Sequence, residues 1–182
     1  MTISTLKKAV MDFFEVINQR HSIRAYKNKP VESEMLQQIL QSVNRAPSAG
    51  NLQAYEVYLV CDDKHKTSLV AAAYAQEFLA QAPIVLVFCA HANRSASRYK
   101  ERGIELYCVQ DATIACTFAM LTATALGLAT VWVGAFDEDE VRRVIGAPPT
   151  RRPVAILPIG YAAEAPHLRP RRSLNNLVHQ VQ

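Results

Sequence analysis

The N-terminal third of the chain alternates between amphipathic and extended patterns. Apolar residues first recur at helical spacing and predict a helix that ends near Gln19. The helical period is lost over residues 20–30, which we expect to be extended. Ser33 then opens a second amphipathic pattern, which predicts a helix ending near Pro47. The apolar positions that define these helices are Val10, Phe13, Phe14, Ile17, Leu36, Ile39, Leu40 and Val43.

Further along the chain, strand patterns alternate with helical ones. Apolar runs predict strands at residues 55–61, 84–89, 130–134 and 154–159. The second run is continuously apolar, as in a strand covered on both faces. Residues 64–80 are Ala-rich and predict a helix between the first two strands. Acidic residues at 137–140 predict the first turn of another helix, because a helix N-terminus favours negative charge.

The longest predicted helix covers residues 103–126 and is apolar nearly all round after Asp111. Such a helix belongs to a core or to a subunit interface, and its small alanines at 112, 115, 119 and 123 permit close packing of helices. Residues 112–136 carry no charge and are long enough to cross a bilayer. Gly127 stands where a helix would end, and β-branched residues follow it. We therefore expect a buried helix and then a strand, and no membrane partner.

Length and composition indicate one globular domain. The chain has 182 residues, half of them hydrophobic and a fifth charged, which excludes disordered and fibrous classes. We expect a single domain over residues 1–182, in which residues 161–182 form an extended C-terminal arm marked by Pro166 and Pro170. The first thirty residues contain no signal-peptide core, so we expect a cytoplasmic protein. The four cysteines never form Cys-x-x-Cys and are expected to be buried and reduced; they are Cys61, Cys89, Cys108 and Cys116.

The distribution of charge favours an anionic partner. The net charge is +4, and much of it comes from arginines toward the C-terminus. The glycines lie too far apart for a G-x-G-x-x-G or Walker loop, so side chains would have to hold the phosphate of any nucleotide. The five histidines show no ligand spacing, and we expect no metal. The C-terminal arginines are Arg142, Arg143, Arg151, Arg152, Arg169, Arg171 and Arg172.

Two short segments carry candidate phosphate ligands. In an extended segment Arg20, Ser22 and Arg24 would share one side, and two guanidiniums flanking a hydroxyl suit a phosphate. Pro170 makes the preceding residue extended, which aligns Arg169 with Arg171 and turns Arg172 away. The alternatives are a solvated face near a helix end and a plain basic tail.

Two further segments suit a flat polar ring. Pro-Ser-Ala-Gly-Asn at residues 47–51 presents a hydroxyl and a carboxamide with little bulk, although a helix-terminating turn explains the same residues. Residues 132–137 join a strand to a helix N-terminus. There Gly134 permits close approach of the backbone to a flat ligand, and exposed N–H groups stabilise negative charge.

Together and in this order, the four segments resemble the FMN-dependent nitroreductase family. Arg-His-Ser-Ile-Arg at residues 20–24 resembles its N-terminal phosphate motif, and residues 47–53 resemble its Pro-Ser-x-x-Asn-x-Gln segment. Gly-Leu at residues 127–128, with residues 132–137, resembles its ring-contacting joint. Arg-Pro-Arg at residues 169–171 resembles its C-terminal phosphate arm, so the resemblance covers almost the whole chain.

The resemblance implies a role for each matching residue. The phosphate end of FMN would be held by Arg20, His21, Ser22, Arg24, Arg169 and Arg171. The flavin bound mainly by the other subunit would be reached by Pro47, Ser48 and Asn51. The residues that would run along the ring edge near N5 are Val133, Gly134 and Ala135. Gln76 would add a polar contact. Two departures from the family pattern, Ala54-Tyr55 for Pro-Trp and Ala135 for a second glycine, concern the acceptor pocket.

The resemblance also implies the fold and the reaction. The expected fold is α+β, a three-layer α-β-α sandwich with a central mixed, mostly antiparallel sheet, assembled as an obligate homodimer with FMN at the interface. The expected reaction is hydride transfer from NADH or NADPH through flavin N5 to a small planar acceptor, such as a nitroaromatic, quinone or enone. One ring face would serve both substrates in a ping-pong mechanism. The cofactor carries the chemistry, so we expect no catalytic side chain.

Two other functions are compatible with parts of the sequence. One is an FMN-binding sensor or storage protein without turnover. The other is a nucleic-acid-binding module, suggested by the basic tail together with Tyr99, Tyr107 and Trp132. Trp132 lies in an apolar run, and the arginines are not interleaved with aromatic residues as a stacking surface requires. We therefore expect small-molecule partners and no nucleic acid.

Overall fold

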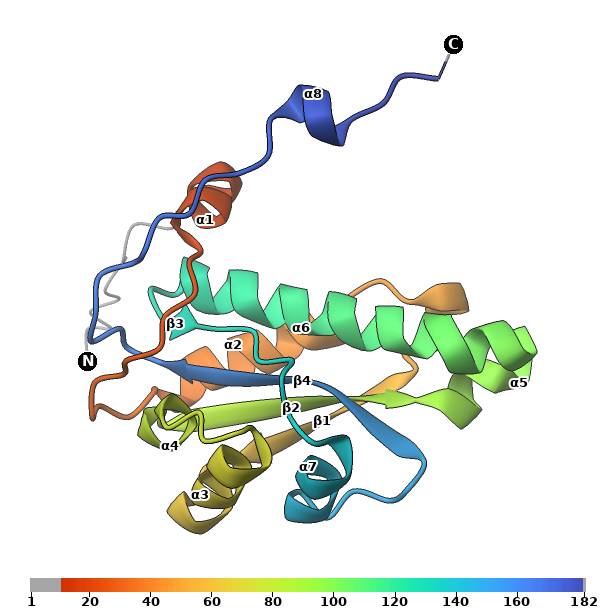
Figure 1. The fold of residues 1–182 in the computed structure, drawn as a ribbon, viewed down its shortest axis with the longest axis horizontal. Helices are drawn as coiled ribbons and strands as arrows, with labels where there is room; N and C mark the ends of the chain where they lie inside the picture. The colour runs from red at the N-terminus through yellow and green to blue at the C-terminus, as the bar shows by residue number, and fades with distance from the viewer. Residues whose placement is uncertain (1–10, 182) are drawn as a thin grey trace, which may run out of the picture.

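The computed structural model describes residues 11–181 and is built on one antiparallel sheet (Figure 1). Its four strands lie in the order β1-β2-β4-β3. All three ladders between them are antiparallel, and a single parallel bridge joins Ser22 to Thr130 at the β3 edge. The strands are β1 (Tyr55–Val60), β2 (Ile84–His91), β3 (Ala129–Thr130) and β4 (Arg151–Gly160).

Helices cover both faces of the sheet, which confirms the predicted α+β fold with three layers. Figure 1 shows α2 and α6 on one face and α3, α4 and α7 on the other. The helices are α1 (Phe13–Gln19), α2 (Ser33–Asn44), α3 (Asp63–Ala72), α4 (Phe78–Gln81), α5 (Ala92–Arg102), α6 (Cys108–Ala125), α7 (Glu138–Val144) and α8 (Leu174–Leu177). Two short turns complete the set, the 3-10 helix η1 (Ala49–Asn51) and the π-helix η2 (Gly103–Tyr107).

Strand β2 is the centre of the core, because its alternate residues enter two hydrophobic clusters. Val85 and Val87 pack with residues of α3, α4 and α7, whereas Leu86 and Phe88 pack with residues of α2 and α6. All four of these side chains are fully buried. The continuous apolar run therefore has the cause predicted for it, a strand covered on both faces.

Helix α6 packs against the same sheet with a face of small residues. Its alanines at 112, 115, 119 and 123 are fully buried in this chain's own core, so they are not available for packing against another subunit. By length and composition alone, Ala92–Ala125 could cross a membrane. Its helical geometry is interrupted at Lys100, where φ is 49°, and α6 serves as a core helix of this fold.

The predicted helix over residues 64–80 is two helices, α3 and α4. Tyr74 and Ala75 between them have positive φ values of 55° and 60°, and the N–H of Ala75 donates to the carbonyl of Val70 at 2.9 Å. Composition favours a helix there, but tertiary contacts decide otherwise. The break brings the Gln76 amide to the carbonyl of Ala135, 2.9 Å away in a distant loop.

Other predicted boundaries also shift. The long helix begins at Cys108, and the preceding residues form α5 and η2, of which α5 was not predicted. The predicted strand at residues 130–134 is reduced to β3, and a single bridge pairs Val133 with Ile156. Val10, assigned to the first helix, lies outside the described residues. Cys61 is exposed, contrary to expectation, whereas Cys89, Cys108 and Cys116 are buried; all four are free thiols.

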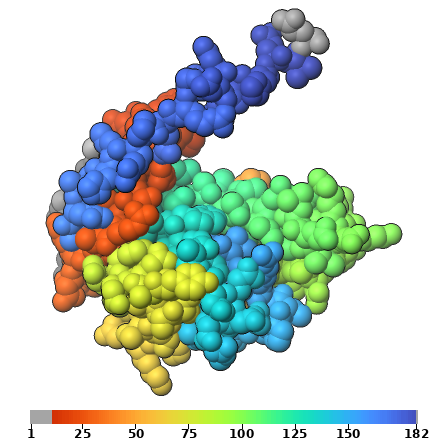
Figure 2. Space-filling model, in the orientation of Figure 1, coloured from red at the N-terminus to blue at the C-terminus, as the bar shows by residue number. Residues whose placement is uncertain are grey.

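The C-terminal arm leaves the body of the molecule. Figure 1 shows it rising past α1 to α8, and Figure 2 shows the same arm projecting from the packed core. Both segments expose large apolar side chains: Phe14 is 74% exposed and Leu174 is 72% exposed. Residue 182, the last of the predicted arm, is outside the described part of the chain. Exposed apolar side chains gathered on neighbouring segments are a feature of contact surfaces.

Candidate functional site

Residues 20–24 are held in an extended conformation beside the edge of the sheet. The N–H of Ile23 donates to the carbonyl of Thr130 at 3.0 Å, next to the parallel bridge that joins Ser22 to Thr130. Ile23 is buried, whereas Ser22 and Arg24 are exposed. This agrees with the expected alternation, which turns the polar side chains of the segment away from the core.

The arginines divide into two groups by their ion pairs. The group on α7 and β4 is neutralised by the chain's own carboxylates: Arg142 pairs with Asp139 (2.6 Å), Arg143 with Glu140, Arg151 with Glu56 (2.7 Å) and Arg152 with Glu138 (2.9 Å). Within residues 11–181, by contrast, no carboxylate lies within ion-pair distance of the side chains of Arg20, Arg24, Arg169 or Arg171. The four arginines of the family motif are therefore among the guanidiniums that remain available for an external anion.

The arm begins against the same segment. The N–H of Arg24 donates to a carboxylate oxygen of Glu164, and the N–H of Ala163 donates to the carbonyl of Ala25 at 2.9 Å. Beyond this point the arm is exposed, Arg169 and Arg171 included. The two halves of the predicted phosphate site therefore share one anchor.

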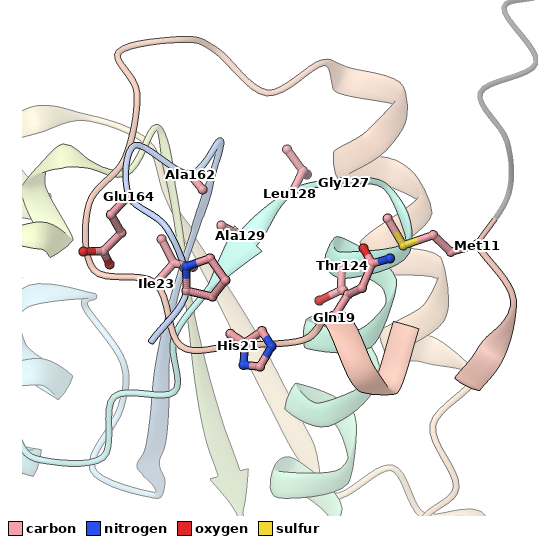
Figure 3. A pocket seen from close by; sticks show the side chains of 11 residues that line it. Met11, Gln19, His21, Ile23, Thr124, Gly127, Leu128, Ala129, Ala162 and Glu164 are labelled. Carbon is pink, nitrogen blue, oxygen red and sulfur yellow. The ribbon is translucent and has the colours of Figure 1, made fainter. Parts of the chain in front are cut away.

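His21 faces a different environment from its neighbours. Its side chain lines a cavity of about 180 Å³ together with Ile23, Thr124 and Glu164 (Figure 3). Ile23 is on the buried side of the segment, so His21 lies on the side opposite Ser22 and Arg24. The cavity is smaller than the roughly 300–1,000 Å³ usual for ligand pockets, and a flavin does not fit inside it.

The joint at residues 133–135 leaves backbone donors free. Val133 is buried and exchanges two hydrogen bonds of 3.0 Å with Ile156. Gly134 and Ala135 are exposed, and their N–H groups donate to no acceptor within residues 11–181. The Gln76 amide donates to the carbonyls of Ala73 and Ala135, both at 2.9 Å, which fixes the joint. Two free N–H groups on a rigid, exposed turn suit the electronegative edge of a flat ring.

The loop at residues 47–51 follows α2 and is held from inside the protein. Gly50 and Asn51 both have φ values of 57°, a conformation that glycine and asparagine tolerate. The Ser48 hydroxyl accepts from the N–H of Gln53 at 2.9 Å. Pro47 and Asn51 remain exposed, so the loop presents its amide outward.

Asp111 is the residue that the sequence reasoning missed at this loop. It is only 2% exposed, and its carboxylate accepts from the N–H of Ala49 at 2.9 Å and from the N–H of Ala54 at 3.3 Å. Burial, and then the Asp111 charge, raise the pKa of nearby Tyr55, whose hydroxyl donates to the carbonyl of Val43 at 2.7 Å. The sequence did contain a signal for this role, because Asp111 is the only charged residue of an otherwise uncharged helix.

One chain cannot bring all predicted site residues together. Asp111 and the loop lie at the N-terminal end of α6, whereas Ser22 and Thr130 lie beyond its C-terminal end. The helix has 18 residues, which at 1.5 Å per residue is about 27 Å. No group of three or more His, Cys, Asp or Glu side chains in the described part of the chain is arranged to hold a metal.

Comparison with known proteins identifies the family to which the fold and the motifs point. The model of the nitroreductase family matches residues 17–76 and 64–161. A Bacillus subtilis (strain 168) protein named FMN reductase (NAD(P)H) is 33% identical over 177 residues, covering 90% of this chain and 71% of the relative.

Solved structures share the fold over nearly the whole chain. The structure of B. megaterium NfrA2 has a TM-score of 0.87 and 29% identity, covering 94% of this chain and 75% of that one. The NADPH:FMN oxidoreductase of Vibrio harveyi, solved in complex with NAD+, has a TM-score of 0.85 and 25% identity. The match covers 93% of this chain and 77% of that one. With the sheet, the extended arginine segment and the rigid joint in their places, the chain belongs to the nitroreductase family.

Proposed function

We propose that the chain is an FMN-dependent oxidoreductase that takes hydride from NADH or NADPH and delivers it to a small planar organic acceptor, such as a nitroaromatic, quinone or enone. The observation that carries this proposal is the set of unpaired arginines on the same chain as a rigid joint with free N–H groups. The activities for which the B. subtilis relative and the V. harveyi enzyme are named support it.

The residues present fit the two ends of FMN. Arg20, Ser22 and Arg24 supply donors for the phosphate, and Arg169 and Arg171 add two more when the arm folds over it. His21 joins this set by family resemblance, after a rotation out of its cavity. Val133 anchors the joint, and the N–H groups of Gly134 and Ala135 stabilise negative charge at the ring edge. Bound FMN supplies the hydride chemistry, so the protein binds, orients and excludes water without a nucleophile of its own.

The site is completed by a second copy of the chain. The loop with Pro47, Ser48 and Asn51 is held by Asp111 near the N-terminal end of α6, whereas the phosphate segment lies beyond the C-terminal end, ~21 Å further along the helix axis. The loop therefore serves the flavin held by the partner. The exposed apolar residues of α1 and of the arm, residues 161–182, supply the interface. We propose an obligate homodimer of one-domain subunits on these grounds.

The donor and the acceptor use one ring face in turn. The sequence contains no glycine-rich dinucleotide motif that would hold a separate nicotinamide site. The protein therefore follows a ping-pong mechanism, in which the oxidised nicotinamide leaves before the acceptor binds. Free thiols, including the exposed Cys61, suit a reducing compartment, and we place the enzyme in the cytoplasm.

The arginine assignment is tested by FMN affinity. We expect Arg20→Ala and Arg171→Ala each to weaken FMN binding by roughly one to two decades, because each loses a charge-assisted contact of about 1.5–3 kcal/mol. Arg172 instead donates to the carbonyl of Asn176, so Arg172→Ala is the matched control. Fluorescence titration of the apoprotein measures the three dissociation constants. Equal losses in all three variants contradict the assignment, and wild-type protein that binds no FMN refutes the proposed function.

Asp111 is expected to control FMN affinity from a distance, because it orders the loop that serves the partner's flavin. Asp111→Asn replaces one acceptor with an NH₂ group and leaves a loop N–H unsatisfied, at a cost of about 1–3 kcal/mol. We expect weaker FMN binding and a lower melting temperature. Gln110→Ala, at an exposed neighbouring position, is the control. An Asp111→Asn protein with unchanged FMN affinity would show that the loop does not serve the flavin.

The assembly is tested by light scattering. The FMN-loaded protein should have the mass of a dimer at micromolar concentration, and Leu174→Glu together with Leu177→Glu should shift it toward monomer, because both side chains are exposed on the arm. The shift should be accompanied by loss of FMN. A wild-type monomer that retains FMN is the result that rules out the shared site.

The shared ring face predicts the kinetic pattern. Double-reciprocal plots should give parallel lines, and NAD(P)H alone should bleach the flavin without an acceptor. Gly134→Val should slow both half-reactions, on the order of 10²-fold, because its Cβ meets Trp132 Nε1 at 3.1 Å and moves the joint from the ring. Ala71→Val, on the exposed side of α3, serves as control. Intersecting lines, with reduction only when acceptor is bound, require a ternary complex instead.

A further inference from the structure

Helix α5 and the turn after it form a hairpin that carries four exposed cations. We call Arg94, Arg98, Lys100 and Arg102 the tip cations; all four are exposed. Within residues 11–181 none of them lies within ion-pair distance of a carboxylate, although Glu101 and Glu105 belong to the same hairpin. Four neighbouring positive charges without a counterion create a potential that attracts an anion.

The hairpin has a fixed shape. In a straight helix residues 95 and 103 would be about 12 Å apart. Here a Cβ on Gly103 would lie 2.7 Å from the carbonyl oxygen of Ser95, because the chain turns at Lys100 and packs back on itself. The Tyr99 and Tyr107 rings meet edge to face at 5.0 Å, and Arg102 Nε donates to the Tyr107 hydroxyl at 2.9 Å. Figure 1 shows α5 folded back at the N-terminal end of α6.

The hairpin touches the loop that the proposed function assigns to the flavin. A Cβ on Gly50 would lie 2.5 Å from the Tyr99 hydroxyl and 2.8 Å from Arg98 Nη1, so only glycine leaves room for them. Arg94 Nε donates to the carbonyl of Leu52 in the same loop. The tip cations therefore lie next to the edge of the flavin pocket rather than at an unrelated surface.

We propose that the tip cations bind the phosphate groups of the nicotinamide dinucleotide donor. This inference rests on the proposed function, which brings a dihydronicotinamide to the ring beside this loop. A donor whose ring enters the pocket has its diphosphate outside, and the sequence offers no glycine-rich loop to receive it. Arginine forks bind such oxygens bidentately, and Lys100 adds a point charge. Because NADPH carries one more phosphate than NADH, the tip cations should increase the affinity for NADPH more than the affinity for NADH.

The experiment measures flavin reduction in FMN-loaded dimer by stopped flow. The donors are NADPH, NADH and 1-benzyl-1,4-dihydronicotinamide, which has no phosphate. We expect Arg98→Gln to raise the apparent dissociation constant for NADPH roughly tenfold or more relative to that for the benzyl donor. Lys100→Gln, at the exposed turn, should do the same to a smaller extent. High salt should weaken NADPH binding to wild type more than to either variant.

Arg143→Gln is the matched control, because this exposed arginine is on α7, on the other face of the sheet. This variant should leave the ratio of the apparent dissociation constants for NADPH and for the benzyl donor unchanged. Unchanged NADPH binding in Arg98→Gln and Lys100→Gln overturns the inference, as does an equal loss with the benzyl donor. Wild-type protein whose flavin no dihydronicotinamide reduces refutes the proposed function itself. A changed KM for the acceptor alone would assign the cluster to the acceptor and also overturn the inference.

Discussion

The packing of α6 on the central sheet is the constraint on which the rest of the structure depends. Its small residues allow the helix to lie close to β2 and β4, and Ala115, Cys116 and Ala119 are fully buried there. The ends of this rigid helix then set the positions of both halves of the site. Asp111 at one end orders the loop after α2, and Thr130 beyond the other end pairs with the arginine segment. A change in this packing would therefore alter both halves at once.

Ion pairing separates structural charge from charge left for ligands. The arginines of α7 and β4 are matched by carboxylates one turn away or on a neighbouring element, as with Arg142 and Asp139. The cations of residues 20–24, of the arm and of the α5 hairpin have no such partner among residues 11–181. A net charge of +4 conceals this division, because the total does not say which charges the fold already neutralises.

Local patterns predicted those elements whose cause is local. The first two helices, the buried strand β2 and the acidic start of α7 follow from periodicity, continuous apolarity and helix-end charge. The α5 hairpin was not predicted because its segment is strongly polar and offers only Ala92, Ala96 and Tyr99 as weakly apolar positions, and because its packing depends on the glycine at 103. The break at Tyr74 was not predicted either, because an alanine-rich segment favours a continuous helix. The contact that accompanies the break is a hydrogen bond from Gln76 to the carbonyl of Ala135, which is distant in the sequence.

By itself, the sequence determined the family motifs, the alternation that exposes Ser22 and buries Ile23, and the need for side chains to hold a phosphate. Each of these depends on residues close together in the chain. Only the tertiary structure decided that the loop at residues 47–51 and the segment with Ser22 lie toward opposite ends of α6, that Asp111 holds that loop, and that Arg98 meets Gly50. These relations join residues far apart in the sequence, and they arise from how the helices pack on the sheet, which no local pattern encodes.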